Sequence, residues 1–325
     1  MRIMPDQPSR LGTATTLPAF HPSSPPSDRL FDEPFLRKLE QLALLSRRAM
    51  AGQLQGERRS PKRGQSVEFA DFRPYARGDD FRRIDWNAYA RLERFFIKLF
   101  VEEEDLTVHM LVDTSRSMDW GEPNKLRYAV RAAGALGYVA LVGLDRVTVT
   151  ALGSELEGNG VMAGQGYFPP RRGKQQAMAL FGFLQALAAG RRAHLTPRLR
   201  AYAAAATKPG PLLLFSDLMD DGWADGLGAL AARGFEVTVL HILSEDEVNP
   251  ELAGDLKLLD VETGFEVEIT ADYDLLQRYR DGLDAWREEL RVFCGARGMH
   301  YVPVETTVPF EELLFAVLRQ RGVLK

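Results

Sequence analysis

The stretch LTVHMLVDTSRSM, residues 106–118, decides the fold. Its first part is a short apolar run, and its second part is a loop of oxygen-bearing side chains. Such an apolar run is typical of a central strand in a parallel sheet, because helices cover both faces of that strand. Ligands of open α/β sheets bind in the loops that leave the carboxyl ends of the strands. The stretch therefore predicts a buried strand that ends in a ligand-binding loop.

The loop contains Asp113, Ser115 and Ser117, which have the spacing Asp-x-Ser-x-Ser. One carboxylate and two hydroxyls are hard oxygen ligands, which suit Mg²⁺, Mn²⁺ or Ca²⁺ better than zinc. The same residue types are also favoured as helix N-caps, so a purely structural role is the alternative. The loop on its own leaves both interpretations open.

A second apolar run, residues 211–215, ends at Ser216 and Asp217, and Thr196 precedes a helix-like run between the two strands. In chain order, the set Asp113, Ser115, Ser117, Thr196 and Asp217 resembles the metal-ion-dependent adhesion site of von Willebrand factor A domains. The resemblance implies that these five residues hold one divalent cation, Mg²⁺ or else Mn²⁺ or Ca²⁺. Binding would in some cases require a partner that supplies a further ligand.

The charge of this predicted site favours adhesion over catalysis. Asp113 and Asp217 supply about two negative charges, which neutralise one divalent ion, and the hydroxyls leave that ion able to bind a partner's carboxylate. One alternative is a Mg²⁺-dependent hydrolase, but it needs a general base that the sequence does not identify. Another is a metal-free scaffold in which Arg116, inside the motif, takes the place of the cation.

Composition restricts the class of protein. The chain has 325 residues, a net charge of −4 and a single cysteine, Cys294, which excludes an internal disulfide. The sequence contains no apolar run of the roughly 18 residues that a membrane span needs, and it starts without a signal peptide. We expect a cytoplasmic protein with neither a nucleic-acid partner nor direct membrane insertion.

Three regions follow one another along the chain. Residues 1–30 are rich in Pro, Ser and Thr and are predicted to be a disordered tail. Residues 31–104 combine a helix, expected over 34–54, with an extension rich in Arg and aromatic residues. That extension, residues 67–101, predicts either a base-stacking surface or a structural crosslink of Arg–Asp pairs and packed rings, and we favour the crosslink because acidic and basic residues alternate. Residues 105–325 form the third region.

The extension carries a family resemblance. Glu68-Phe69, Arg73-x-Tyr75, Gly78-Asp79, Arg83-Ile84-Asp85-Trp86 and Ala90-Arg91 precede an acidic run and then Asp-Thr-Ser-x-Ser-Met. This order resembles the bacterial family called domain of unknown function 58, over roughly residues 35–320. The resemblance implies a von Willebrand factor A-like domain and, as partner, a MoxR-type AAA+ ATPase or its client protein. The chain is similar to the short members, which lack N-terminal membrane spans.

The remaining sequence alternates between helix and strand patterns. Strands are expected over 146–152, 235–243 and 300–304, a hairpin over 256–269, and a hairpin or irregular edge over 154–170. Helices are expected over 124–144, 174–189, 223–233, 272–297 and 309–321. This alternation predicts an α/β fold with a von Willebrand factor A-like, doubly wound, mostly parallel sheet flanked by helices, plus an N-terminal helix and a small β-rich extension.

Motifs for nucleotide hydrolysis and for a nucleophile elbow are absent from the sequence. His109 and His241 lie inside expected strands and are interpreted as structural residues. We therefore predict a non-enzymatic protein–protein interaction module, an adaptor or co-chaperone, that binds a partner carboxylate through the metal.

Overall fold

The computed structural model describes residues 2–4, 30–41, 68–76, 79–101, 106–153, 166–190, 194–259 and 265–320. The chain divides into two compact units. The main unit comprises Met1–Arg48 together with Leu106–Lys325, and the inserted unit comprises Ala49–Asp105. None of the described helices is long and apolar enough to cross a membrane.

A six-stranded sheet forms the centre of the main unit, with the strand order β11-β8-β7-β4-β5-β6. Every neighbouring pair is parallel except β5 and β6, which are antiparallel. The strands are β4 (Thr107–Val112), β5 (Arg146–Ala151), β6 (Tyr167–Arg172), β7 (Pro211–Ser216), β8 (Glu236–Leu243) and β11 (His300–Glu305). The winding direction reverses between β4 and β7, and such a switch point is where open α/β sheets bind ligands.

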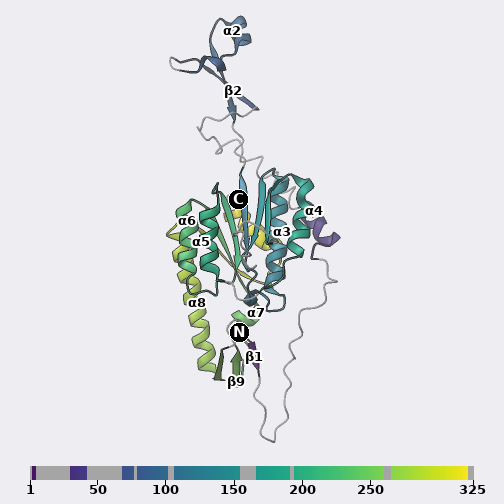
Figure 1. Ribbon diagram of the computed structural model, residues 1–325, viewed down its shortest axis with the longest axis vertical. Helices are drawn as coiled ribbons and strands as arrows, with labels where there is room; N and C mark the ends of the chain where they lie inside the picture. Colours follow the sequence, from purple (N-terminus) through teal and green to yellow (C-terminus); the bar gives the residue numbers. More distant parts are fainter. Residues whose placement is uncertain are drawn as a thin grey trace. The chain divides into compact units, whose positions relative to one another are not determined.

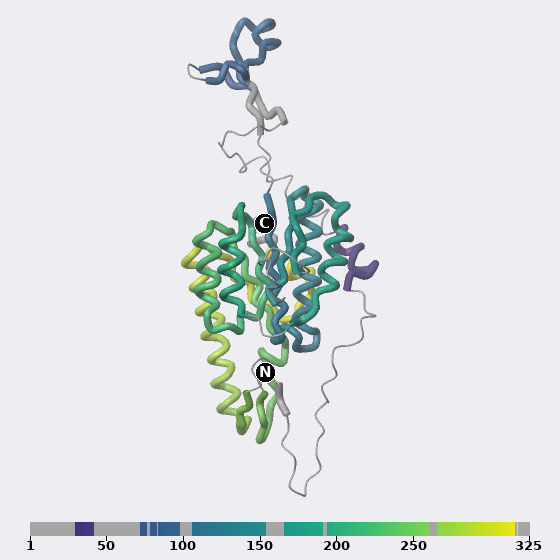
Figure 2. The backbone as a smooth tube through the Cα atoms, viewed as in Figure 1, coloured from purple at the N-terminus to yellow at the C-terminus, as the bar shows by residue number. Residues whose placement is uncertain are grey.

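Helices cover both faces of this sheet (Figures 1 and 2). One face carries α3 (Lys125–Val142), α4 (Ala177–Gln185), α9 (Phe310–Gln320) and the helical residues 33–41. The other face carries α5 (Leu195–Ala205), α6 (Trp223–Arg233) and α8 (Tyr273–Gly295). The prediction of an α/β fold with a mostly parallel sheet flanked by helices is confirmed.

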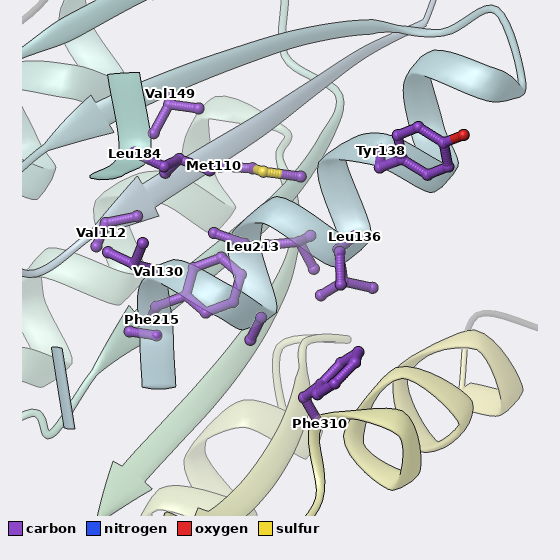
Figure 3. Packing of buried hydrophobic residues seen from close by; sticks show 14 of the residues in the cluster. Met110, Val112, Val130, Leu136, Tyr138, Val149, Leu184, Leu213, Phe215 and Phe310 are labelled. Carbon is purple, nitrogen blue, oxygen red and sulfur yellow. The ribbon is translucent and has the colours of Figure 1, made fainter. Parts of the chain in front are cut away.

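The central strand β4 is buried on both faces, as its apolar sequence predicts. Met110 and Val112 belong to the hydrophobic core beneath α3, while Leu111 belongs to the core beneath α5. Figure 3 shows Met110, Val112 and Phe215 packed with residues of α3. His109 points to the α5 side, where its Nδ1 lies 2.7 Å from the Tyr202 hydroxyl. This buried contact agrees with a structural role.

The N-terminal segment belongs to the main unit, which corrects the predicted division into regions 31–104 and 105–325. Phe31, Phe35 and Leu39 are buried in the core of the α3 face, and the Phe31 ring stacks on Phe181 at a centroid distance of 4.6 Å. Gly134 permits this approach, because a Cβ there would lie 2.3 Å from the Phe31 ring. Residues 42–54 of the expected helix lie outside the described residues.

A second, three-stranded sheet contains β1 (Arg2–Met4), β9 (Gly254–Leu259) and β10 (Glu266–Ala271), all antiparallel. The β9–β10 pair confirms the hairpin that was predicted over 256–269. The prediction of a disordered tail over residues 1–30 was wrong for Arg2–Met4, which pair with β9. Residues 5–29 lie outside the described residues. The irregular edge is described only from residue 166, where β6 forms the antiparallel edge of the main sheet.

The inserted unit is an antiparallel pair, β2 (Glu68–Pro74) and β3 (Phe96–Val101), with α2 (Trp86–Leu92) between them. Arg73 pairs with Asp79 at 2.8 Å, whereas Asp80 and Asp85 accept backbone N–H groups at the starts of short helices. Tyr89 stacks on Phe95 at 4.4 Å. The crosslink interpretation was thus right for Arg73 and Asp79. It was wrong in placing the rings inside, because Phe81 and Trp86 expose 67% and 60% of their surface.

Candidate functional site

The Asp113 carboxylate joins the ends of the two central strands. Its Oδ1 accepts the backbone N–H of Ser115 at 2.9 Å, which shapes the loop after β4. Its Oδ2 accepts the Ser216 hydroxyl at 2.6 Å, which connects the loop to the last residue of β7. Asp113 is buried, so these two contacts hold its carboxylate in one position.

The two motif serines lie side by side in the same loop. The Oγ atoms of Ser115 and Ser117 are 3.0 Å apart, with Ser115 buried and Ser117 half-buried. Two adjacent ligands of an octahedral Mg²⁺ ion also stand about 3 Å apart, because each lies about 2.1 Å from the ion at a right angle to the other. The spacing of the hydroxyls therefore fits one edge of such a coordination shell.

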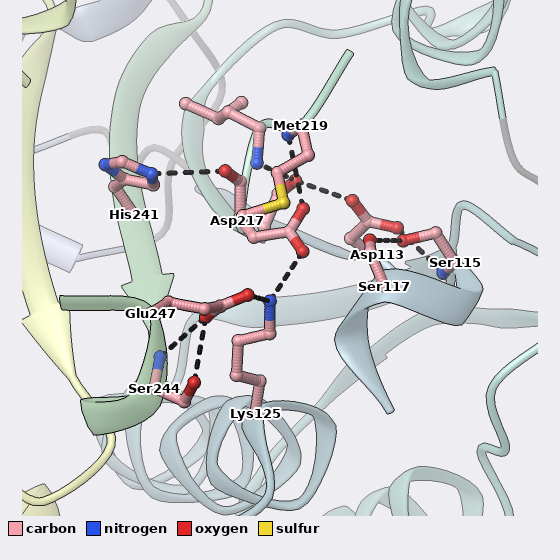
Figure 4. Close-up of polar contacts among 11 residues, drawn as sticks. Asp113, Ser115, Ser117, Lys125, Asp217, Met219, His241, Ser244 and Glu247 are labelled. Atoms are coloured by element: carbon pink, nitrogen blue, oxygen red, sulfur yellow. Dashed lines mark hydrogen bonds and ion pairs between the residues drawn. The ribbon is translucent and has the colours of Figure 1, made fainter. Parts of the chain in front are cut away.

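Asp217, one residue beyond β7, lies on the other side of this loop and is engaged by a lysine (Figure 4). Its Oδ1 accepts the Met219 N–H at 3.3 Å, and its Oδ2 accepts Lys125 Nζ at 2.8 Å. The Lys125 side chain, from the first residue of α3, has no exposed surface. The same ammonium donates to Glu247 Oε1 at 2.6 Å.

Glu247 is itself held by the helix on which it sits, α7 (Glu245–Val248), which follows β8. Its Oε2 accepts the backbone N–H of Ser244 at 2.8 Å and the Ser244 hydroxyl at 3.1 Å, which completes a capping box. Capping boxes fix the start of a helix and the side chains that form them. The contacts with Ser244 therefore fix the Glu247 carboxylate in the position where it pairs with Lys125.

Burial and neighbouring charge set the protonation of the cluster. Burial, together with the charge of Asp217, raises the pKa of Asp113 to about 6, against the opposing hydrogen bonds from Ser216 and Ser115. Burial would also raise the pKa of Asp217, but the Lys125 ammonium holds that pKa below its ordinary value. The two carboxylates outweigh the burial of Lys125 and raise its pKa. Asp113 therefore protonates more readily than Asp217.

Sequence reasoning missed Lys125 and Glu247. Glu247 carried a usable signal, since an acidic run follows β8, and β8 is the next strand to β7 in the sheet. Lys125 carried no such signal, because the sequence around a buried lysine at the start of a helix looks the same as the sequence around an exposed one. The buried cation of the site is this lysine; Arg116, which was considered for that role, is exposed.

Four of the five predicted residues meet at the switch point, and Thr196 has a different partner. Its hydroxyl donates to Asp220 Oδ1 at 3.0 Å, while Asp220 Oδ2 accepts the backbone N–H of Leu195. These contacts join the first turn of α5 to the loop after β7. The threonine therefore fixes the loop that follows Asp217.

His241 lies behind Asp217, on β8, and does not offer a free ring nitrogen. Its Nε2 contacts the Asp217 carbonyl oxygen at 3.1 Å and its Nδ1 contacts the Tyr301 hydroxyl at 2.7 Å. Burial lowers the pKa of His241 to about 4. Both nitrogens are occupied by structural contacts, which agrees with the structural role expected from the sequence.

The donor set fits a hard divalent cation. Asp113 and the two serine hydroxyls supply oxygen ligands, and three carboxylates against one ammonium leave two negative charges unbalanced when all are ionised. Within the described part of the chain, no group of three or more His, Cys, Asp or Glu side chains could hold a metal ion. The other side-chain ligands that this cluster offers beside Asp113 are the two serine hydroxyls.

Fold and site together define a mixed α/β protein with a polar cluster at the switch point of a mostly parallel sheet. The chain belongs to the family described as Protein of unknown function DUF58, whose family model matches residues 71–289. It is 27% identical over 312 residues to uncharacterized proteins from Mycobacterium bovis and Mycobacterium tuberculosis, covering 94% of this chain and 96% of each relative.

Two solved structures are similar to parts of this chain. One is the conserved hypothetical protein BatB from Bacteroides thetaiotaomicron, with 16% identity, a TM-score of 0.41, and coverage of 67% of this chain and 97% of that one. The other is the pilus adhesin SpaC from Lactobacillus rhamnosus GG, open conformation, with 11% identity, a TM-score of 0.40, and coverage of 69% and 30%.

Proposed function

We propose that this chain is a non-enzymatic protein-interaction module of the von Willebrand factor A type. Its Asp-x-Ser-x-Ser loop would bind a divalent cation and, through it, a carboxylate of a partner protein. The observation that carries the proposal is the pair of serine hydroxyls, 3.0 Å apart beside the buried Asp113 carboxylate.

Ser115, Ser117 and Asp113 are the residues that would hold the cation. A bound Mg²⁺ would supply an electrophilic centre with one position open to a carboxylate oxygen. Asp217 would act from outside the coordination shell, because it is paired with the charged Lys125 ammonium, whereas the Ser115 N–H and the Ser216 hydroxyl that donate to Asp113 carry no charge. Lys125 and Glu247 balance each other in charge, so Asp113 and Asp217 keep the two negative charges that a divalent ion neutralises.

The contacts of the site support binding rather than hydrolysis. A hydrolase would need a general base within hydrogen-bond reach of an attacking water. The candidate histidine, His241, uses both ring nitrogens in contacts with Asp217 and Tyr301. A side chain free to act as a general base beside the cation would favour the alternative, a Mg²⁺-dependent hydrolase.

A second candidate is a metal-free module, and the position of Lys125 favours it. Its ammonium lies 2.8 Å from Asp217 and supplies positive charge inside the cluster without any ion. In that case the loop would be a rigid scaffold that binds its partner in the absence of metal. The two candidates differ in one measurable property, which is the effect of a chelator.

The proposed partner is a MoxR-type AAA+ ATPase or a client protein that it remodels. This proposal rests on the resemblance to domain of unknown function 58 proteins, which are typically encoded beside such ATPases. The test is to measure binding of a purified MoxR-type ATPase from the same organism by surface plasmon resonance, in Mg²⁺ and in EDTA. Asp113→Asn is the informative variant, and Asp119→Asn, an exposed acidic residue nearby in the loop, is its matched control.

The metal-mediated proposal predicts that EDTA and Asp113→Asn each weaken binding at least about tenfold, the effect of losing one charge-assisted contact of about 1.5–3 kcal/mol. Asp119→Asn should bind like the wild type. If neither EDTA nor Asp113→Asn changes the affinity for the ATPase, the metal-mediated proposal is wrong and the metal-free module is favoured. If the ATPase binds in neither buffer, the proposed partner is wrong.

A further inference from the structure

The inserted unit exposes most of its large apolar side chains. Its exposed large hydrophobic residues are Phe72, Tyr75, Phe81, Trp86, Tyr89, Leu92 and Phe95. Among the described side chains of this unit, Ile97 is the one hydrophobic residue that is buried, and α2 buries none. Single exposed hydrophobic residues are normal on a protein surface, whereas a contiguous group of them marks an interaction site.

Four of these rings pack against one another and form a continuous surface. The Tyr89 ring stacks on Phe95 with the centroids 4.4 Å apart and the planes at 3°. Trp86 stands edge-on to both rings at 6.3 Å, and Tyr75 meets Phe95 at 6.2 Å. Leu92 lies three residues after Tyr89 on α2, so it extends the same face of the helix. We call Tyr75, Trp86, Tyr89, Leu92 and Phe95 the aromatic patch.

The aromatic patch has the apolar area of one side of a protein interface. Trp86 and Leu92 each keep 60% of their surface exposed, and the other three residues keep 36–43%. A completely covered aromatic side chain buries about 150–250 Å², so the exposed part of the patch amounts to roughly 400–500 Å². A standard interface covers about 800 Å² on each partner, of which somewhat more than half is apolar. The patch is therefore large enough to bind a protein.

The charges of the inserted unit favour a second copy of the chain as that protein. Residues 49–105 contain as many Asp and Glu residues as Lys and Arg residues. A nucleic acid needs a net positive surface, and a strongly charged protein needs a surface of the opposite sign. Glu93 and Arg94, which separate Leu92 from Phe95, are both exposed. Since every contact about a two-fold axis occurs twice, a surface with both signs side by side can complement itself.

We propose that the aromatic patches of two copies of this chain pack against each other and form a symmetric dimer. The rings of each copy cover those of the other and supply the interior that two strands and one short helix lack. Glu93 of each copy pairs with Arg94 of the other across the axis. The dimer does not depend on the proposed metal site, because the whole patch belongs to the inserted unit.

The dimer would have a consequence for the proposed function, and this consequence alone rests on that function. Two copies present two Asp113 loops on one particle. A partner that carries two carboxylates within reach would then bind with a higher apparent affinity than one copy alone provides.

Sedimentation equilibrium of the full chain across the micromolar range measures the dimer. The test variants are Trp86→Ser and Leu92→Ser, because both side chains are exposed in the single chain and their removal should cost the fold little. The matched control is Tyr273→Ser, since Tyr273 is an aromatic residue of the main unit with 75% of its surface exposed. Thermal unfolding of the dilute, monomeric chains checks that each variant is folded.

We expect a concentration-dependent equilibrium between monomer and dimer in the wild type and in Tyr273→Ser. Trp86→Ser should weaken the dimer at least about thirtyfold, which is the effect of losing a central aromatic residue of an interface. Leu92→Ser should weaken it about tenfold through the lost apolar area. If Trp86→Ser lowers the Tm of the dilute chain, Leu92→Ser provides the test without it.

Charge reversal tests whether the patches themselves meet. Glu93→Arg and Arg94→Glu each place like charges opposite one another, so each variant alone should dimerise more weakly than the wild type. An equal mixture of the two variants should form heterodimers in preference to either homodimer, because both contacts then join opposite charges.

Three results would overturn the proposal. A wild type that stays monomeric throughout the concentration range would assign the patch to a different protein. A dimer that both Trp86→Ser and Leu92→Ser leave unchanged would lie on another surface. A mixture of Glu93→Arg and Arg94→Glu without an excess of heterodimer would exclude the reciprocal pairing of the two patches.

Discussion

Replacing Lys125 with methionine should destabilise the main unit strongly. The lysine side chain is entirely buried, and its ammonium lies 2.8 Å from Asp217 and 2.6 Å from Glu247. Removing one partner of a buried ion pair costs about 3–5 kcal/mol, because the remaining charge is left buried and uncompensated. Here two carboxylates lose their cation, so we expect a loss at the upper end of that range. Since domains of this kind are stable by only about 5–15 kcal/mol, the loss is readily measured.

Urea unfolding, followed by circular dichroism at neutral pH, measures this loss. Lys174→Met is the matched control, because Lys174 pairs with Glu40 at 3.0 Å but keeps 61% of its side chain exposed. Exposed pairs contribute about 0–1 kcal/mol, so the control should remain near the wild type. The double variant Lys125→Met with Glu247→Gln removes one of the two uncompensated charges and should recover part of the lost stability.

Mn²⁺ adds a second arm to this experiment. Without the lysine, the cluster has one more unbalanced negative charge, so the variant should bind the ion more tightly than the wild type. At a metal concentration of about 100 times Kd, binding stabilises the folded state by about 2.7 kcal/mol. A cost below about 1 kcal/mol for Lys125→Met would contradict a lysine buried between these two carboxylates. Failure of Mn²⁺ to stabilise the variant would contradict a cation-binding cluster, since no cation would then occupy it.

Three further predictions concern other parts of the main unit. Burial lowers the pKa of His109 to about 4. The unfolded chain therefore takes up a proton near pH 6.5 that folded His109 does not bind, so this residue alone should contribute a stability loss of about 2 kcal/mol from pH 7 to pH 5. In urea titrations at the two pH values, His109→Gln should lose less stability than the wild type by about that amount. Gly134→Ala should cost about 1–3 kcal/mol, because its Cβ would lie 2.3 Å from the Phe31 ring, whereas Gly182→Ala, which meets nothing within 4 Å, should be neutral or stabilising in the same thermal scans. Thr196→Val should cost about 1 kcal/mol through its lost bond to Asp220 and leave Mn²⁺ affinity within about twofold; a larger drop in affinity would restore Thr196 as a ligand.

The sheet and its central loop could be predicted because each rests on a local pattern. Apolar runs ending at Asp113 and Asp217 predicted two strands, and the geometry of parallel sheets predicted that their carboxyl ends meet. The Asp113–Ser216 hydrogen bond is the direct contact between those ends. The hairpin at β9 and β10 was predictable for the same reason, since its partners are close in sequence.

The features that escaped prediction depend on contacts between distant parts of the chain. Nothing in the residues around Lys125 indicates that its ammonium is buried, because its partners lie 92 and 122 residues away. Phe31 and Phe35 looked like part of a separate N-terminal region, although they belong to the core beneath α3. Aromatic residues of the inserted unit were expected inside, yet a two-stranded sheet with one short helix offers too little interior for them.

Calorimetric titration of Mn²⁺ and Mg²⁺ into the purified chain, beside Asp113→Asn, measures whether the loop after β4 binds a divalent cation. We expect saturable binding of one ion per chain in the wild type and its loss in Asp113→Asn, with Asp119→Asn binding like the wild type. Saturable binding that persists in Asp113→Asn would contradict it, because the ion would then lie elsewhere. Absence of heat in the wild type, even with acetate added to supply the partner's carboxylate, would favour the metal-free module, in which the Lys125 ammonium supplies the positive charge beside Asp217.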